Sequence, residues 1–242
     1  NFIDHILLLF DFEKKYFEKE NISCEFVGHP LLEDKERSKI DINQIIRKNK
    51  ALISMFAGSR KSEIIVLMPI LLDFIKLMNE KYTDMVYVFH STKEYSQLLQ
   101  SFISKSNLSN CEIVSDEKIK SHILEKSVFA VAKSGTVSLE ISNAKIPSII
   151  LYKMNFINFL IIKSLVKTNY ANIINFAANE EVIPELLQSN CNSKNIFIQV
   201  SNFLENPKKI KEQLEKVQTI LNGFKTNKSS SELASLSLNK FL

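Results

Sequence analysis

The feature that most constrains the fold of this chain is the alternation of short apolar runs with longer amphipathic stretches. The runs have the composition of strands, and we expect strands at residues 6–10, 25–27, 52–56, 85–89, 112–114, 128–132 and 148–151. Helical spacing fills the intervals at 63–81, 93–105, 117–124 and 137–144. Strands and helices in this order form βαβ units. The sequence therefore predicts an α/β fold with a Rossmann-like parallel sheet and flanking helices.

The pattern changes toward the C-terminus, where helical spacing replaces the alternation. Helices are expected at 181–188, 194–205 and 207–221, and the residues from 226 onward are rich in Ser, Lys and Asn. We therefore expect a Rossmann-like domain over 1–178, helices packed on it over 179–225, and a loosely ordered tail over 226–242.

Glycines mark the ends of three predicted strands. The chain has only four glycines, and Gly28, Gly58 and Gly135 lie in the loops GHP, AGSR and KSGT, each just after a strand. A plain turn would explain any one of them, because glycine tolerates backbone angles that other residues avoid. Ligands of an open parallel sheet, however, bind beyond the carboxyl ends of its strands. Three such loops with hydroxyl and basic residues favour a rim for an anionic ligand.

The loop SGT shows both interpretations. Ser134, Gly135 and Thr136 stand at the predicted start of a helix, where exposed N–H groups favour an anion. The same hydroxyls could instead simply cap the helix. Glu140 lies one turn further and could either complement the helix dipole or accept hydrogen bonds from the two hydroxyls of a ribose.

The loop AGSR repeats this arrangement after an earlier strand. It contains Gly58, Ser59 and Arg60. The guanidinium of Arg60 could grip a phosphate through its planar fork, or it could lie in solvent in the first turn of a helix. The spacings of a P-loop and of GxGxxG are both absent, and no Asp-x-Asp pair occurs, so we expect neither a metal nor a bound cofactor.

Composition argues against some classes of protein. The net charge of +4 is spread along the chain with no basic stripe between aromatics, which argues against nucleic acid as a partner. Cys24, Cys111 and Cys191 lie far apart, as expected of reduced thiols in a cytoplasmic protein. The apolar stretch over 146–166 is interrupted by lysines and asparagines, which disfavours a helix that spans a membrane.

The segment MNFINFLIIKSLVK, residues 154–167, is predicted to form an apolar helix with lysines toward one end. It is either a buried core helix or a helix that lies on a membrane or on acyl chains. In the second case the lipid contacts are Phe156, Phe159 and Leu160, with Lys163 and Lys167 facing lipid phosphates.

Six segments together resemble the lipid-A-disaccharide synthase family, inverting glycosyltransferases of the two-Rossmann-domain (GT-B) type, family 19. They are DHILLLFDFEKKYF, FVGHPL, AGSRKSEI, AKSGTVSLE, LYKMNFINFLIIKSLVKTNYANIINFAA and ELLQ, in the family's order and spacing over residues 2–188. The resemblance begins midway through the family's length. We therefore expect a fragment that lacks the N-terminal acceptor domain, together with any general base that this domain carries.

The resemblance implies transfer of a diacylglucosamine unit from UDP-diacylglucosamine to diacylglucosamine 1-phosphate, which forms the lipid A disaccharide and releases UDP. It implies no cofactor or metal, and a peripheral location on the cytoplasmic face of the inner membrane of a Gram-negative bacterium; a homodimer is open. It assigns the donor site to Gly58, Ser59, Arg60, Ser134, Gly135, Thr136, Glu140 and Asn175, with Lys133 and Tyr152 as further candidates.

Two departures from the family pattern touch this site. FAGSR stands where the family commonly has Leu-Pro-Gly-Ser-Arg, and Lys133 stands where a small residue is usual, which adds a charge near the expected diphosphate. Other interpretations stay open: a different UDP-sugar glycosyltransferase, a UDP-N-acetylglucosamine epimerase of the same architecture, or a non-catalytic remnant that binds nucleotide or membrane. An epimerase would act on the donor without any lipid acceptor.

Overall fold

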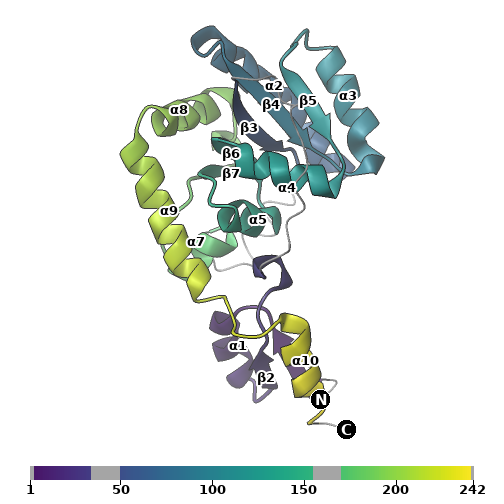
Figure 1. The fold of residues 1–242 in the computed structure, drawn as a ribbon, viewed down its shortest axis with the longest axis vertical. Coiled ribbons are helices and arrows are strands. Elements are labelled where there is room, and N and C mark those ends of the chain that lie inside the picture. The colour runs from purple at the N-terminus through teal and green to yellow at the C-terminus, as the bar shows by residue number, and fades with distance from the viewer. Residues whose placement is uncertain (1–2, 34–49, 155–169, 241–242) are drawn as a thin grey trace.

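A six-stranded parallel sheet organises the computed structural model, which describes residues 3–33, 50–154 and 170–240 (Figure 1). The strand order is β5-β4-β3-β6-β7-β8, and neighbours pair in parallel throughout. The strands are β3 (Ala51–Phe56), β4 (Met85–His90), β5 (Cys111–Val114), β6 (Phe129–Lys133), β7 (Ser148–Tyr152) and β8 (Glu185–Leu187). The central strands are covered on both faces, which explains why they are apolar almost without interruption.

The direction in which strands are added reverses between β3 and β6. From β3 the chain adds β4 and β5 on one side, and it then returns to place β6, β7 and β8 on the other side. In such sheets ligands bind in the crevice outside the carboxyl ends of the strands, at the point of reversal. The loops that follow β3 and β6 contain the AGSR and SGT segments, so they flank the position that the fold itself favours for a ligand.

Helices cover both faces of the sheet. On one face, Ile53, Met55 and Phe129 pack against buried residues of the helices α2 (Lys61–Lys81), α3 (Ser96–Ser104) and α8 (Ser193–Leu204). On the other face, Ala130, Ala132 and Ile150 share a second core with the remaining helices, and Leu52 and Val88 pack on Ile123. These helices are α4 (Glu117–Lys126), α5 (Val137–Asn143), α7 (Ile173–Ala178) and α9 (Pro207–Asn222).

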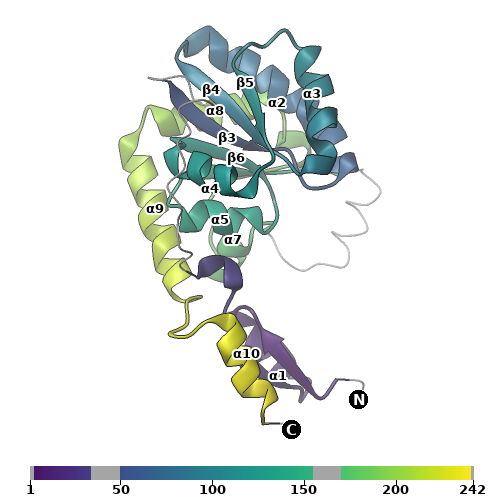
Figure 2. The ribbon, with the colours of Figure 1, turned by 45° about the vertical axis from the view of Figure 1, so that its right-hand side comes forward.

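The two ends of the described chain form a small separate unit at the foot of the molecule (Figures 1 and 2). Here β1 (His5–Leu8) pairs in parallel with β2 (Ser23–Phe26), and α1 (Lys14–Glu18) connects them. The helix α10 (Ser230–Leu238) packs beside this pair: the hydroxyl of Ser237 donates to Glu25 Oε2 at 2.8 Å, and His5 Nε2 lies 3.1 Å from the same hydroxyl.

The predicted alternation is confirmed, since each of the seven expected strands is present within about two residues of its expected ends. Two expectations at the C-terminal side are wrong. Residues 181–188 contain β8 rather than a helix, because Leu186 pairs with Leu151 at the sheet edge and is buried there. Residues 230–238 form α10 rather than a loose tail, because Ser229 caps the helix and Ser237 anchors it.

The expected domain division also differs from the structure at the N-terminus. We expected residues 1–178 to form one domain, whereas β1 and β2 pair only with each other and not with the six-stranded sheet. The reason is long-range: the partner that covers them is α10, some 200 residues later in the sequence.

Candidate functional site

The loop after β3 is shaped by the fit between Gly58 and Glu63. Gly58 has φ of +111°, in the region that favours glycine. A Cβ atom on Gly58 would lie 2.5 Å from Glu63 Oε2 and 2.7 Å from Glu63 Cβ. Glycine is therefore required twice, by the backbone angle and by the side chain that folds back over it from the first turn of α2.

Three nitrogen groups from the chain after β3 and from the end of β6 lie around the carboxylate of Glu63. Glu63 Oε2 accepts a hydrogen bond from the Ser59 amide at 3.0 Å. Glu63 Oε1 lies 2.9 Å from Lys133 Nζ and 4.0 Å from Arg60 Nη1. Burial acts to raise the pKa of Glu63, but the hydrogen bond and charge of Lys133 outweigh it, and the pKa lies below its ordinary value. Glu63 is therefore ionised at neutral pH and links the ends of β3 and β6.

Arg60 and Lys133 differ in how closely they pair with the Glu63 carboxylate and in how far their side chains are exposed. The side chain of Lys133 is 20% exposed, and its ammonium also lies 5.4 Å from the centroid of the Tyr152 ring, at the end of β7. Burial raises the pKa of the Tyr152 phenol, so the ring stays neutral. The side chain of Arg60 is 79% exposed and only at the limit of an ion pair with Glu63. Arg60 is thus the cation of this group that most readily reaches an anion outside the chain.

The loop after β6 presents Gly135 and Thr136 to solvent and buries Ser134. The Ser134 hydroxyl donates to the carbonyl of Ala171, so it holds the loop to the segment before α7. The φ of Gly135 is not positive, and a Cβ there would meet no atom within 4 Å. The tight-turn explanation that the sequence left open therefore applies to Gly58 and not to Gly135. The open space over Gly135 leaves its backbone accessible.

A cavity of about 360 Å³ lies against the SGT loop. Ser134, Gly135 and Thr136 form part of its wall, and Leu9 and Phe10 approach from the N-terminal segment. The remaining lining residues are His29, Leu139, Tyr170, Ala171, Asn172, Ile173 and Phe176. His29 is fixed by accepting a hydrogen bond from the Leu31 amide at 3.1 Å, and burial lowers its pKa. The cavity thus joins polar loop atoms to a largely apolar wall.

The resemblance assigns Asn175 to the donor site, but its side-chain amide makes all of its hydrogen bonds within the chain. It is fully buried, its Nδ2 donates to the Ile183 carbonyl and to Glu185 Oε1, both at 2.7 Å, and its Oδ1 accepts from the amides of Val182 and Ile183, both at 2.9 Å. A side-chain amide offers two donor hydrogens and two acceptor positions. In this structure Asn175 therefore has no hydrogen-bonding group left for a ligand and acts as a structural residue.

Glu185 extends the same network toward the SGT loop. Its two carboxylate oxygens accept from the amides of Ala171 at 2.7 Å and Asn172 at 3.0 Å. Because Ser134 donates to the carbonyl of Ala171, the loop, the start of α7 and β8 are connected by side-chain hydrogen bonds. Asn175 and Glu185 thus support the wall of the cavity from behind.

Glu140 lies on the exposed side of α5, one turn beyond the SGT loop. Its backbone carbonyl accepts from the Ala144 amide at 2.9 Å, which is part of the helix end. The carboxylate is therefore on the surface beside the loop that the sequence associates with a ribose.

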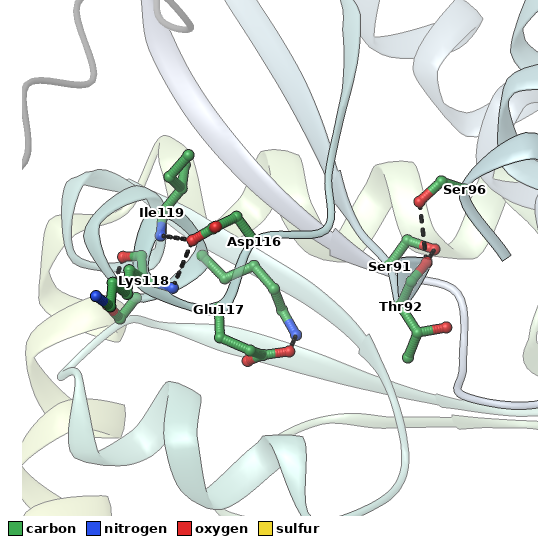
Figure 3. A network of polar contacts seen from close by, with 9 residues as sticks. Ser91, Thr92, Ser96, Asp116, Glu117, Lys118 and Ile119 are labelled. Carbon is green, nitrogen blue, oxygen red and sulfur yellow. Dashed lines mark hydrogen bonds and ion pairs between the residues drawn. The ribbon is translucent and has the colours of Figure 1, made fainter. Parts of the chain in front are cut away.

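At the neighbouring strand ends on the same edge of the sheet, polar side chains form hydrogen bonds with the backbone (Figure 3). Asp116 accepts from the amides of Lys118 and Ile119 at 2.9 and 3.2 Å and so begins α4. After β4, the hydroxyls of Ser91 and Ser96 both donate to the carbonyl of Thr92 at 2.9 Å. These polar groups satisfy the backbone, whereas the loops after β3 and β6 keep Arg60 and Gly135 exposed.

The expected lipid contacts lie outside the described residues: Phe156, Phe159, Leu160, Lys163 and Lys167. Within 3–33, 50–154 and 170–240, no helix is long and apolar enough to cross a membrane. The same residues contain no group of three or more His, Cys, Asp or Glu side chains placed to hold a metal ion. Cys24, Cys111 and Cys191 are free thiols.

A family model described as lipid-A-disaccharide synthetase matches residues 1–238, nearly the whole chain. The chain belongs to the lipid-A-disaccharide synthase family. Its relatives include the lipid-A-disaccharide synthases of Rickettsia prowazekii, 33% identical over 96% of this chain, and Rickettsia bellii, 34% identical over 95%. The chain spans 62% and 61% of the length of these two family members.

Solved structures of low sequence identity share the fold of this chain. S. aureus MnaA, in a co-structure with UDP, is 16% identical and superposes with a TM-score of 0.67 over 98% of this chain and 60% of its own. A UDP-GlcNAc 2-epimerase from Neisseria meningitidis, bound to UDP-GlcNAc, is 17% identical with a TM-score of 0.55 over 82% of this chain and 47% of its own. This likeness establishes the fold, a Rossmann-like half of the GT-B type.

Sequence reasoning missed the two acidic residues that organise the site. Glu63 stands inside the segment AGSRKSEI, three residues after Arg60, and a glutamate at the third position of a helix commonly reaches back to the preceding loop. That spacing was the available signal. Glu185 carried no local signal, because its partners Ala171 and Asn175 become neighbours only when β8 joins the sheet.

Proposed function

We propose that this chain is the part of a lipid-A-disaccharide synthase that holds the UDP-linked donor. In the whole protein, the reaction moves a diacylglucosamine unit from UDP-diacylglucosamine to diacylglucosamine 1-phosphate and releases UDP. The observation that carries the proposal is the position of two anion-accepting loops, AGSR and SGT, on either side of the point where the strand order reverses. Membership of the family supports the donor's identity.

The chemistry requires that negative charge growing on the departing UDP be met by fixed dipoles and cations. In the proposal, Arg60 contributes a permanent charge from the first loop, since its side chain is exposed. Gly135 lets the diphosphate approach the second loop, because the space that a Cβ would take there is open to 4 Å. Thr136 adds a hydroxyl, and Glu140 receives the ribose hydroxyls.

The apolar cavity beside the SGT loop fits the same assignment. A donor that carries both a diphosphate and acyl chains needs polar loop atoms next to an apolar wall, and Thr136 and Phe176 line one cavity. Tyr152 ends β7, and the centroid of its ring lies 5.4 Å from the Lys133 ammonium; we propose that it borders the sugar.

The test is calorimetric titration of the chain with UDP. Wild type should bind, and Arg60→Ala should lose about 1.5–3 kcal/mol of binding free energy, the value of a charge-assisted hydrogen bond. Lys61→Ala is the matched control, because Lys61 is an exposed cation that directly follows Arg60 and begins α2. Equal affinities for wild type and Arg60→Ala would remove Arg60 from the donor site.

The lipid partners are a second part of the proposal. We place the protein at the cytoplasmic face of the inner membrane through residues 154–167, which lie outside the described residues. Sedimentation with vesicles that contain anionic lipid should be lost in a Lys163→Glu, Lys167→Glu variant. If both proteins sediment equally, these lysines do not face lipid phosphates.

An epimerase of the same fold is distinguished by its products. Incubation with UDP-N-acetylglucosamine alone should leave the sugar unchanged, because the proposed reaction requires a lipid acceptor. A 2-epimer or free UDP in that incubation would favour the epimerase.

A further inference from the structure

The carboxylate of Glu63 occupies the centre of the group that the sequence associates with a diphosphate. The Ser59 amide donates to it at 3.0 Å, the Lys133 ammonium lies 2.9 Å away and the Arg60 guanidinium 4.0 Å away. Three groups expected to meet the ligand therefore meet one side chain of the chain itself. Glu63 and Lys133 are also the two most shielded members of this group, with side chains 14% and 20% exposed.

This arrangement changes the charge available to a ligand. From the sequence alone, Lys133 is expected to be an added cation near the diphosphate. In the structure its charge is neutralised by Glu63 at 2.9 Å, and the ammonium also lies 5.4 Å from the centroid of the Tyr152 ring. A carboxylate left without Lys133 would place a negative charge beside the loops that the donor's two phosphates must approach.

We propose that Lys133 is a positioning residue that acts through Glu63 and does not itself bind the diphosphate. Its ion pair neutralises Glu63, which is the effect that matters to the ligand, and it also ties the end of β6 to the start of α2, which adds to the stability of the chain. The inference rests on the proposed function for its ligand, but the tie between the loops is a property of the chain alone.

The experiment compares four proteins: wild type, Lys133→Ala, Glu63→Gln and the double variant. Calorimetry with UDP and with inorganic pyrophosphate should show at least a tenfold loss of affinity in Lys133→Ala for both ligands, because Glu63 is left charged. Glu63→Gln should bind nearly as wild type, since an amide oxygen can still accept from Ser59. The double variant should recover to within about threefold of Glu63→Gln. A double variant as weak as Lys133→Ala would overturn the proposal and make Lys133 a direct phosphate ligand.

Thermal unfolding of the same four proteins separates this inference from the proposed function. The two substitutions should be non-additive, because each removes the same ion pair. The matched control is Lys76→Ala with Asp73→Asn, an exposed pair at the same 2.9 Å distance on the same helix, which should be additive. If wild type binds neither ligand, the proposed function fails, and the unfolding measurements alone then test the tie between the loops. A coupling free energy between Lys133→Ala and Glu63→Gln that exceeds the coupling in the control pair supports the tie. Additive effects of the two substitutions on unfolding overturn it.

Discussion

Glu63 folds its side chain over Gly58 so closely that a Cβ on the glycine would lie 2.7 Å from the Glu63 Cβ. The contact lets the carboxylate reach the Ser59 amide and, across the crevice, Lys133. A glycine that sequence reasoning associates with a ligand is therefore needed first by the protein's own side chain. The shape of the loop and the electrostatics of the site depend on this one approach.

Gly58→Ala should destabilise the fold, whereas Gly135→Ala should not. At Gly58 an alanine meets both a positive φ and the Glu63 side chain, so the free energy of unfolding should fall by about 1–3 kcal/mol. At Gly135 neither obstacle exists, and the change should stay within about 0.5 kcal/mol. Urea denaturation measures both. The pair of variants is matched, because each adds one methyl group to a loop on the same edge of the sheet.

The same two variants also test where the ligand approaches. Gly135→Ala should weaken UDP binding despite its normal stability, because the added methyl group would stand in the space assigned to the diphosphate. Unchanged UDP affinity in a fully folded Gly135→Ala protein would show that the ligand does not come close to this backbone.

Asn175→Ala should lower the free energy of unfolding, because the hydrogen bonds that the side chain makes are buried. The substitution leaves the amide and the carbonyl of Ile183 without their buried partner, whereas the Val182 amide keeps the carbonyl of Glu180. An unsatisfied buried group costs about 1–3 kcal/mol, so a decrease in that range or above is expected in urea denaturation. Asn222→Ala, at the exposed end of α9, is the control. If Asn175→Ala unfolds like wild type but binds UDP more weakly, Asn175 contacts the ligand instead.

The sequence predicted those parts of the fold that depend on local pattern. Apolar runs and helical spacing located the strands of the main sheet, because strands covered on both faces must be apolar. Arg60 and Gly135 lie in exposed loops after strands, as expected from the same pattern, and their contact with a ligand stays a prediction.

What the sequence did not predict depends on partners distant in the chain. β8 has only three residues and is a strand because it pairs with β7. The polar composition that suggested a loose tail over 226–242 equally suits α10, whose Ser237 meets Glu25 of β2. The ion pair between Lys133 and Glu63 joins residues that lie 70 positions apart in the sequence. No local window contains these pairs.

The stability of the protein should fall in acid through His90. This residue ends β4, is buried, and its Nε2 lies 2.8 Å from the Ser54 hydroxyl. Burial lowers the pKa of His90 from 6.5 to about 3. Since the unfolded chain binds this proton at a higher pH than the folded chain does, stability is full above about pH 6.5 and declines as the pH falls toward 3.

Urea denaturation between about pH 7.5 and about pH 5 should therefore show a loss of about 2 kcal/mol in wild type that is absent from His90→Gln. Glutamine cannot gain the charge, and it keeps an amide to pair with Ser54. His5→Gln, at the small unit, is the control for histidine replacement in general. Parallel pH curves for wild type and His90→Gln would contradict the assignment of this loss to His90.

Glu140 separates recognition of a nucleoside from recognition of its phosphates. Its carboxylate lies on the exposed side of α5, one turn beyond Gly135 and Thr136, where it can accept hydrogen bonds from two neighbouring hydroxyls of a ribose. UDP has that ribose and pyrophosphate does not. Glu140→Gln should therefore weaken UDP by about 1 kcal/mol, roughly fivefold, because an amide replaces a charged acceptor. Its affinity for pyrophosphate should change by less than about twofold.

Thermal-shift titrations of wild type and Glu140→Gln with each ligand provide the measurement. Glu215→Gln, an exposed acidic residue on α9, serves as the control for loss of one surface charge. If Glu140 only complements the dipole of α5, both ligands should weaken to the same extent, since the substitution would then alter the helix and not a contact with the ribose. A ratio of UDP to pyrophosphate affinity that falls in Glu140→Gln alone is the result that assigns Glu140 to the nucleoside, because only a direct contact with the ribose distinguishes the two ligands.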